Sequence, residues 1–393
     1  MRKAVVYIGM TYPHGIIRHF ALLALEMEKL RRSTSVDFDL YFASTDGETG
    51  QNAWPMIRDG FASDYILSGP DFAELSTRIA DLTASYDCVL VHTGGGWGQT
   101  KHLVRARTRL DKKHARRLRF VATTHAFRID SWHRIWMSAF QCFLYALFYD
   151  KVVFQCRYAA SRFLGAWLLS LLGKKAVIPL GCETFDEVPL SPPPGFVTNG
   201  LANVLDGGSF TFVYLAQFRP GKMHMWLVQA LSPVMKDHPA VHLLLWGMGD
   251  EVILKQVRAY AEQEGLADRV LTPGQIPRCE IPWLLTHSNC AVVPSRGETF
   301  GHNFIEPMFA GLPVLGTRVG IGCEVIEDGV TGYGFSLTDV DGFRRSAKVL
   351  VEDVKAARRM GRAARERVES RYRHSDVARQ LIDLYAEVME HAC

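Results

Sequence analysis

The chain has 393 residues, which is more than one hydrophobic core usually organises, so its length predicts two domains of similar size. Hydrophobic residues make up 48% of the chain and charged residues 22%, a globular composition that excludes a largely disordered protein. The net charge is only +4, and we expect no nucleic-acid partner. The eight cysteines are scattered without a Cys-x-x-Cys pair, which favours a reducing cytosol and argues against structural zinc.

Strand and helix patterns alternate along the first half of the chain. The apolar run after Arg2 and Lys3 is short and lacks a signal-peptide cleavage pattern, so KAVVYIG is expected to be the first strand. A helix is expected from about residue 16 to 31, after Gly15. Further strands are expected at FDLYFAS, DCVLVHT, LRFVATTH, KVVFQ and KAVIPLG. Strands separated by helices predict a parallel sheet that helices cover on both faces.

Two consecutive segments of this half bear on membranes. Residues 135–149 are nearly all apolar or aromatic, but they fall short of the roughly 20 residues that span a bilayer. Residues 101–120 carry nine Lys and Arg against the single Asp111. Residues 135–149 could be a buried core helix, and residues 101–120 could form the solvated face of another helix. Alternatively, residues 101–149 bind peripherally to the anionic inner face of the cell membrane.

The alternating pattern stops at SPPPGFVTNG and then restarts. We therefore predict an N-terminal domain over residues 1–185, a linker over 186–208 and a C-terminal domain over 209–373, followed by a helix over 374–393 that returns to the first domain. The second domain is expected to repeat the doubly wound parallel sheet, with strands at FTFVYLAQ, VHLLLWG, RVLTPG, CAVVPS and LPVLGT. Ligands of such sheets bind beyond the carboxyl ends of the strands, so the residues that follow each strand are candidates for the site.

The segment after CAVVPS, from Arg296 to Glu306, is a glycine-containing loop that runs into a helix. A helix N-terminus offers free N–H groups and a positive dipole end, which suit a diphosphate, and Gly301 allows close approach of the backbone. The carboxylates of Glu298 and Glu306 could accept hydrogen bonds from sugar hydroxyls. Taken alone, they could also simply favour the start of the helix.

The wider segment VVPSRGETFGHNFIEPMFAGLPVLGTRVGIGCEVIEDGVTGYGF resembles the donor site of the retaining group 1 (family-four) glycosyltransferases. It has the Glu-x(7)-Glu spacing of Glu298 and Glu306, the preceding Pro-Ser, and the AGLPV run. The resemblance implies the GT-B fold, in which two Rossmann-like domains face a cleft and C-terminal helices pack back toward the first domain. It departs from the family at Pro307, where Ala is usual; we expect this proline in the first turn of its helix, where its missing N–H has no partner to lose.

The resemblance also implies roles for single residues. Glu306 would bind the ribose hydroxyls of a nucleotide sugar, and Glu298 the hydroxyls of the transferred sugar. The amides near Thr299, Phe300 and Gly301 would face the phosphates. FRPGK resembles the family's basic clamp, in which Arg219 and Lys222 would stabilise the departing nucleoside diphosphate. The preceding Ala216-Gln217 departs from the usual Gly-Arg. Donor contacts are further implied for the strand-end residues Gly247, Gln275 and Ile276.

In the first domain, His125 ends a strand where the family has a histidine near the reacting sugar, and Gly15 resembles the glycine loop on the acceptor side. Gly94–Gly96 is a weaker candidate. The Asp-x-Asp patterns at Asp37 and Asp339 fit a strand and a helix start, so we expect no metal and no cofactor.

The expected function is transfer of a hexose from a nucleoside-diphosphate sugar to a hydroxyl with retention of configuration. GDP-mannose is slightly favoured over UDP-sugars as the donor, and a lipid-linked or surface-polysaccharide precursor over a soluble acceptor. No paired carboxylate nucleophile is evident, which favours attack from the face of the leaving group. A catalytically silent glycan-binding subunit is the alternative from another class, and an epimerase or phosphorylase is a further one that the Glu-x(7)-Glu segment disfavours.

Overall fold

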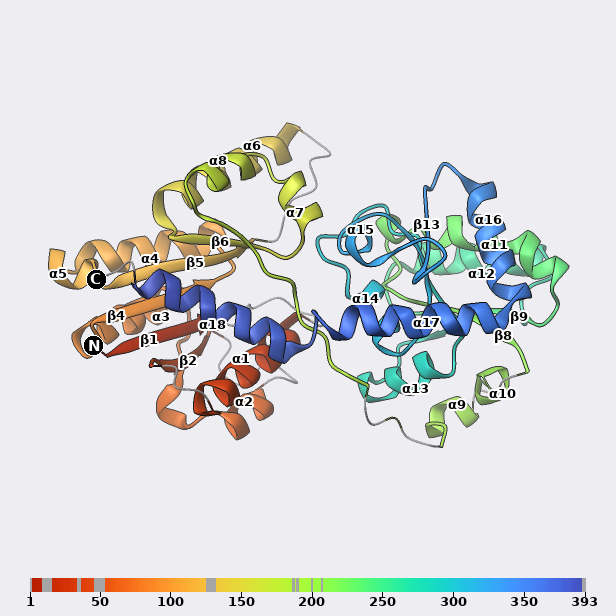
Figure 1. Cartoon of the computed structure of the whole chain (residues 1–393), viewed down its shortest axis with the longest axis horizontal. Coiled ribbons are helices and arrows are strands. Elements are labelled where there is room, and N and C mark those ends of the chain that lie inside the picture. The colour runs from red at the N-terminus through yellow and green to blue at the C-terminus, as the bar shows by residue number, and fades with distance from the viewer. Residues whose placement is uncertain are drawn as a thin grey trace. The chain divides into compact units, whose positions relative to one another are not determined.

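The structure is a computed structural model that describes residues 2–8, 16–33, 37–45, 54–124, 132–185, 188, 191–198, 201–205 and 208–390. Its contacts divide the chain into two compact units (Figure 1). Unit 1 comprises Met1–Gly181 and Tyr372–Cys393, and unit 2 comprises Cys182–Arg371. Each unit is built on one parallel sheet, as the alternating sequence pattern predicts.

The sheet of unit 1 has the strand order β3-β2-β1-β4-β5-β6-β7, and each neighbouring pair is parallel. Its strands are β1 Lys3–Ile8, β2 Asp39–Ser44, β3 Ile66–Ser68, β4 Cys88–Thr93, β5 Leu118–Thr124, β6 Lys151–Phe154 and β7 Lys175–Val177. Its main helices are α1 Ile16–Ser33, α2 Trp54–Gly60, α3 Phe72–Asp81, α4 Trp97–Arg109, α5 Lys112–Ala115, α6 Trp132–Phe148, α7 Arg157–Arg162, α8 Ala166–Leu171 and α18 His374–Glu390.

Both faces of this sheet are buried. Along β1, Val5 and Tyr7 belong to one hydrophobic core, whereas Ala4, Val6 and Ile8 belong to another. Successive side chains of a strand point to opposite faces, so the two cores lie on the two faces of the sheet. The helices α1, α2 and α18 contribute to the first core, and α3, α4, α6 and α8 contribute to the second.

The last helix of the chain is an integral part of unit 1. Helix α18 packs against α1 (Figure 1), and its Tyr385 is fully buried. The hydroxyl of Tyr385 bonds Nδ1 of His92 on β4, while Nε2 of the same imidazole lies 2.7 Å from Thr123 Oγ1. The preceding helix α17, Val354–Glu369, instead packs against α14, His302–Phe309, in unit 2. Only the final helix therefore returns to the first domain.

The sheet of unit 2 has the order β10-β9-β8-β11-β12-β13, again with parallel pairs. The strands are β8 Phe210–Leu215, β9 Val241–Trp246, β10 Val270–Gly274, β11 Cys290–Val293, β12 Val314–Thr317 and β13 Gly332–Phe335. The helices not yet given are α9 Pro194–Thr198, α10 Leu201–Leu205, α11 His224–Asp237, α12 Glu251–Gln263, α13 Ile281–Thr286, α15 Gly322–Val325 and α16 Val340–Glu352. The strand order reverses between β8 and β11, which makes this pair the topological switch point where doubly wound sheets bind ligands.

The segment 186–208 is not a free linker over its described part. It contains α9 and α10, which belong to unit 2. The ring of Phe196 is buried between Trp246 and Trp283, with centroid separations of 5.3 and 5.2 Å. The three prolines signal the end of the first alternating pattern, but Phe196, Leu201 and Leu205, which follow them, are buried residues of unit 2.

Candidate active site

Two loops meet at the switch point of unit 2. One follows β8 and runs from Ala216 to Met223, and the other follows β11 and runs from Pro294 to Gly301. The backbone N–H of Arg296 in the second loop donates to the carbonyl of Gly221 in the first at 2.9 Å. The FRPGK and RGETFG segments, which lie far apart in the sequence, are therefore neighbours.

The loop after β8 is fixed to the end of β9 through its backbone. The N–H of Phe218 donates to the carbonyl of Met248 at 3.0 Å, and its carbonyl accepts from Asp250 at 2.8 Å. Gly249 lies in this contact with φ of 151°, and a Cβ there would lie 2.3 Å from the Phe218 carbonyl oxygen. Only glycine fits such an approach of two backbones without displacing one of them.

His224 packs against the same loop. It begins α11, is buried, and stacks on Phe218 with 4.2 Å between ring centroids. Burial lowers the pKa of His224 to about 4, so the imidazole is neutral at physiological pH. Met223 precedes it in the left-handed conformation, with φ of 58°, and turns the chain from the loop into the helix.

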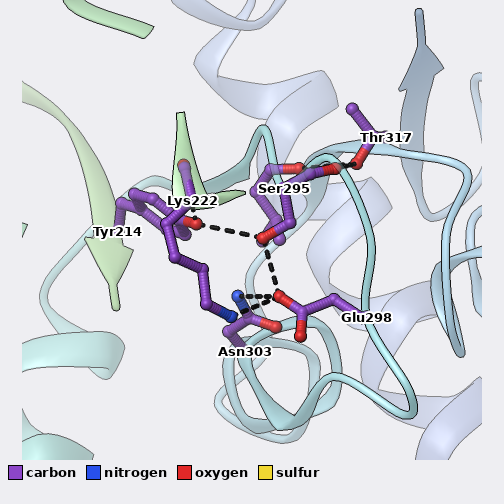
Figure 2. A network of polar contacts seen from close by, with 7 residues as sticks. Tyr214, Lys222, Ser295, Glu298, Asn303 and Thr317 are labelled. Carbon is purple, nitrogen blue, oxygen red and sulfur yellow. Dashed lines mark hydrogen bonds and ion pairs between the residues drawn. The ribbon is translucent and has the colours of Figure 1, made fainter. Parts of the chain in front are cut away.

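Glu298 is the centre of a hydrogen-bonded cluster (Figure 2). Its Oε1 lies 2.5 Å from Lys222 Nζ, and it accepts from Ser295 Oγ at 2.7 Å and from Asn303 Nδ2 at 3.5 Å. Three donors on one carboxylate oxygen hold the side chain in one orientation. The cation of the loop after β8 and the carboxylate of the loop after β11 thus form one ion pair.

The cluster rests on buried groups of the sheet. The hydroxyl of Tyr214, on β8, lies 3.1 Å from Ser295 Oγ and donates to the Lys222 carbonyl at 3.1 Å. Thr317 Oγ1, at the end of β12, donates to the Ser295 carbonyl at 2.6 Å. Burial raises the pKa of Tyr214, so its phenol keeps the proton that it donates. Figure 2 shows Tyr214 and Thr317 reaching Ser295, whose hydroxyl in turn points to Glu298.

The helix after this loop begins at His302, with Gly301 as its N-cap residue in the left-handed conformation at φ of 99°. Phe300 is buried, and its carbonyl accepts from Ile321 at 2.7 Å. The expected place of Pro307 was wrong. It is the sixth residue of α14 rather than part of the first turn, so it removes an intrahelical hydrogen bond, and the helix ends two residues later at Phe309.

Glu306, on α14, forms a second ion pair, with a residue from another element. The residue is 7% exposed, and its Oε1 accepts from Arg278 Nη2 at 2.8 Å. Arg278 also contacts Glu183 Oε2, at 3.0 Å from Nη2 and 3.1 Å from Nε. The charge of Glu306 raises the pKa of Arg278, and Glu183 adds to the effect. Burial, with the same Glu306 charge, raises the pKa of the Cys182 thiol, which therefore stays protonated.

The remaining predicted site residues divide into two groups. In unit 2, Gly247 donates through its N–H to the Gly274 carbonyl at 3.1 Å, which joins the loop before Gln275 and Ile276 to the end of β9. Arg219 is exposed at the start of the FRPGK loop and is not part of the cluster that the described residues form around Glu298. Gly15 and His125 lie outside the described residues.

Sequence reasoning missed several members of the two clusters. They are Glu183, Tyr214, Arg278, Ser295, Asn303 and Thr317. Ser295 and Asn303 lie within the quoted motif, so their proximity to Glu298 was a usable signal. Arg278 follows the predicted Gln275 contact by three residues, but nothing in the sequence connects it with Glu306.

A family comparison bears directly on these loops. Residues 202–367 match the model of the glycosyl transferases group 1 family. The matched segment is less than half of the 393-residue chain. The matched segment includes both loops of the site, from Lys222 to Glu306, and all six strands of the second sheet.

Proteins similar to this chain are named for sugar transfer or sugar attachment. N-acetyl-alpha-D-glucosaminyl L-malate synthase of Bacillus anthracis is 34% identical over 179 residues, a match that covers 45% of each chain. A phosphatidyl-myo-inositol mannosyltransferase of Mycolicibacterium smegmatis is 28% identical, over 68% of this chain and 65% of that protein. The first match thus spans less than half of the relative's length.

Solved structures match the whole fold at low identity. Anabaena Alr3699/HepE in complex with UDP superposes with a TM-score of 0.74 at 18% identity, over 98% of this chain and all of that one. Sucrose-phosphate synthase from Thermosynechococcus elongatus gives 0.70 at 18% identity. The chain has the two-sheet GT-B fold, as the motif resemblance predicted.

Proposed function

We propose that the chain is a glycosyltransferase that moves a hexose from a nucleoside-diphosphate sugar to an acceptor hydroxyl and retains the anomeric configuration. The observation that carries the proposal is the Lys222–Glu298 pair, which joins the two loops at the switch point of the second sheet. A cation for the leaving group and a carboxylate for the sugar hydroxyls are thereby within one side-chain length of each other.

In this proposal each part of the site has a separate task. Glu306 binds the ribose hydroxyls, and the N-terminus of α14 with the amides near Phe300 and Gly301 binds the diphosphate. Lys222 neutralises the charge that grows on the diphosphate as the glycosidic bond breaks. Arg219 is exposed in the same loop and would add a second positive charge once a donor is bound.

The geometry of Glu298 favours attack from the face of the leaving group. A carboxylate nucleophile must present a lone pair to the anomeric carbon, as in retaining glycosidases. Lys222, Ser295 and Asn303 hold Oε1 of Glu298, which leaves only Oε2 for such an attack. The departing diphosphate oxygen would then accept the proton of the attacking hydroxyl. A trapped glycosyl adduct on Glu298 would contradict this order of events.

The donor and acceptor are assigned by weaker arguments. Several relatives have names that specify mannose transfer, one of them from GDP-mannose to a phosphatidylinositol mannoside, which supports GDP-mannose and a lipid-linked acceptor. The structural match with bound UDP keeps UDP-sugars open. The relative named for L-malate supports the alternative of a soluble acceptor. In a silent glycan-binding subunit, the same clusters would bind a sugar without turnover.

The deciding experiment measures nucleoside diphosphate release by the full chain from a panel of GDP- and UDP-sugars, with and without lipid extract and EDTA. The test variants are E306A and K222A. The matched control is K236A, which breaks the exposed Lys236–Glu264 pair at 2.6 Å, remote in sequence from both loops.

We expect release from one donor, unaffected by EDTA, and about a hundredfold slower in both test variants than in K236A. The anomeric configuration of the product, measured by NMR, should equal that of the donor. Nucleotide binding without release from any donor would support the silent subunit, and equal release by E306A and wild type would refute the proposed site.

A further inference from the structure

Helix α6 carries apolar side chains on the face that it turns to solvent. Its inner side is buried in the second core of unit 1 through Cys142 and Tyr145. On its outer side Trp136, Phe140, Phe143 and Leu147 recur every three or four residues and are between 48% and 72% exposed. A helix on the surface of a globular protein ordinarily has polar residues there, so this face is unusual.

The exposed face continues onto the neighbouring helices. Trp97 of α4 contacts Phe140 with 5.5 Å between ring centroids. Helix α8 lies beside α6 (Figure 1), and its Trp167 and Leu171 are 70% and 77% exposed. Because α4, α6 and α8 bury their inner sides in the same core, their outer sides are on the same side of unit 1. We name the set Trp97, Trp136, Phe140, Phe143, Trp167 and Leu171 the aromatic face.

The segment that carries this face is rich in positive charge. Residues 97–177 include sixteen Lys and Arg against three Asp and no Glu, a net charge of +13. Because the whole chain is +4, the remainder is −9. On α4, Lys101 and Arg105 follow Trp97 at intervals of four residues, and Arg105 is exposed. Lys174 donates to the Ala146 carbonyl at the end of α6 at 2.7 Å, and Lys175 beside it is exposed.

We propose that the aromatic face docks the chain on the surface of an anionic lipid bilayer. Indole rings favour the level of the lipid headgroups, and Lys and Arg beside them attract anionic headgroups. No helix among the described residues has the length and apolar character to cross a membrane, so the docking is confined to the interface. A second copy of the chain fits this face poorly, since the basic residues beside it, Lys101, Arg105 and Lys175, would then oppose those of the other copy.

The proposal goes beyond glycosyl transfer and does not depend on it. The aromatic face belongs to unit 1, whereas the clusters of Glu298 and Glu306 belong to unit 2. Vesicle binding therefore remains testable in a variant that has lost the donor site.

The test is sedimentation of the full chain with vesicles of phosphatidylcholine, alone or in equal parts with phosphatidylglycerol. The first variant is W136S/F143S/W167S, which changes only exposed side chains; its control is V252S/V349S, which makes the same kind of change at exposed valines of unit 2. The second variant is K101E/R105E, and its control is K355E/R358E on α17. Thermal unfolding confirms that each variant is folded.

We expect wild type and E306A to bind the phosphatidylglycerol vesicles equally, and less at high salt. The triple serine variant should lower the partition coefficient at least about tenfold, and K101E/R105E should lower it for the anionic vesicles, while both controls bind like wild type. Equal binding by the folded triple variant would overturn the proposal. So would a wild-type dimer in light scattering that the triple variant dissociates, since the face would then bind a second copy.

Discussion

Arg278 Nη2 lies 2.8 Å from the buried carboxylate of Glu306, and the same guanidinium contacts Glu183 at 3.0 Å. One cation thus pairs with two carboxylates, one of which is implied to bind the ribose of the donor. The ion pair offsets part of the cost of burying the Glu306 carboxylate. Arg278 would therefore act as a positioning residue for nucleotide binding rather than as a catalytic one.

Replacing Arg278 by Met should weaken donor binding more than it slows the chemical step. Glu306 would lose the cation that holds it, and its carboxylate would turn toward water. Because Arg278 is 43% exposed at its side chain, we expect a modest loss of about 1–2 kcal/mol in donor affinity, seen as a tenfold higher KM at nearly constant kcat. Steady-state kinetics measure the split. The control R258M removes an exposed arginine of α12 that bonds Thr272 on β10, the strand that precedes Arg278 in the chain.

Lys222, which pairs with Glu298, should behave in the opposite way. Its replacement should slow the chemical step more than it weakens donor binding. If the ammonium stabilises the departing diphosphate, K222M should lower kcat about a hundredfold or more and change KM little. K222R should recover part of the rate because it restores the charge in a different geometry. An unchanged kcat in K222M, with Arg219 intact, would assign the leaving-group role to Arg219 instead.

The sequence predicts the two sheets because hydrophobic strands alternate with helical patterns over nearly the whole chain. It missed β3 and β13, since Ile66–Ser68 and Gly332–Phe335 are short and the second contains two glycines. It also merged α4 and α5 into one basic helix, although Asp111 caps the second by accepting from the His114 N–H at 2.9 Å. Local patterns do not reveal such breaks, because a capping bond depends on one side-chain orientation.

The site was predictable only where its residues form part of a contiguous motif. Glu298 and Glu306 are recognisable from their spacing, and Lys222 from its loop. The contact between that loop and Gly249 depends on two strand ends that the fold brings together. The same holds for the Arg278–Glu306 pair, whose members lie 28 residues apart on different elements. Parallel sheets create such contacts between distant segments, and composition or periodicity carries no record of them.

Gly249 should be intolerant of even one methyl group. In G249A the new Cβ would meet the Phe218 carbonyl oxygen at 2.3 Å, in a backbone conformation that L-residues rarely adopt. The loop that carries Lys222 must then shift, and we expect a loss of about 1–3 kcal/mol in the free energy of unfolding together with slower transfer. Chemical denaturation and the release assay measure the two effects. G208A is the control, because a Cβ at Gly208 meets nothing within 4 Å.

Acidification should destabilise unit 2 through His224. Burial lowers the pKa of this imidazole to about 4 in the folded chain, compared with an ordinary value of 6.5. Below pH 6.5 the unfolded chain takes up a proton that the folded chain refuses, so stability is fully present above that pH and is lost as the pH falls toward 4. The same direction holds for His92 in unit 1, where burial lowers the pKa to about 3.

The variant H224F isolates the contribution of this imidazole, because a phenyl ring keeps the stack on Phe218 and cannot take up a proton. Between pH 7 and pH 4, we expect the free energy of unfolding of wild type to fall by about 3 kcal/mol more than that of H224F. The shift of the His224 pKa from 6.5 to about 4 requires a difference of this size. Urea unfolding followed by tryptophan fluorescence measures both across that range, with the partly exposed His114 replaced by Gln as the control. Equal losses of unfolding free energy in wild type and H224F would contradict this prediction. They would mean that the stack of His224 on Phe218 opens and exposes the imidazole to water before unit 2 unfolds. The FRPGK loop, which contains Phe218, would then be mobile at low pH.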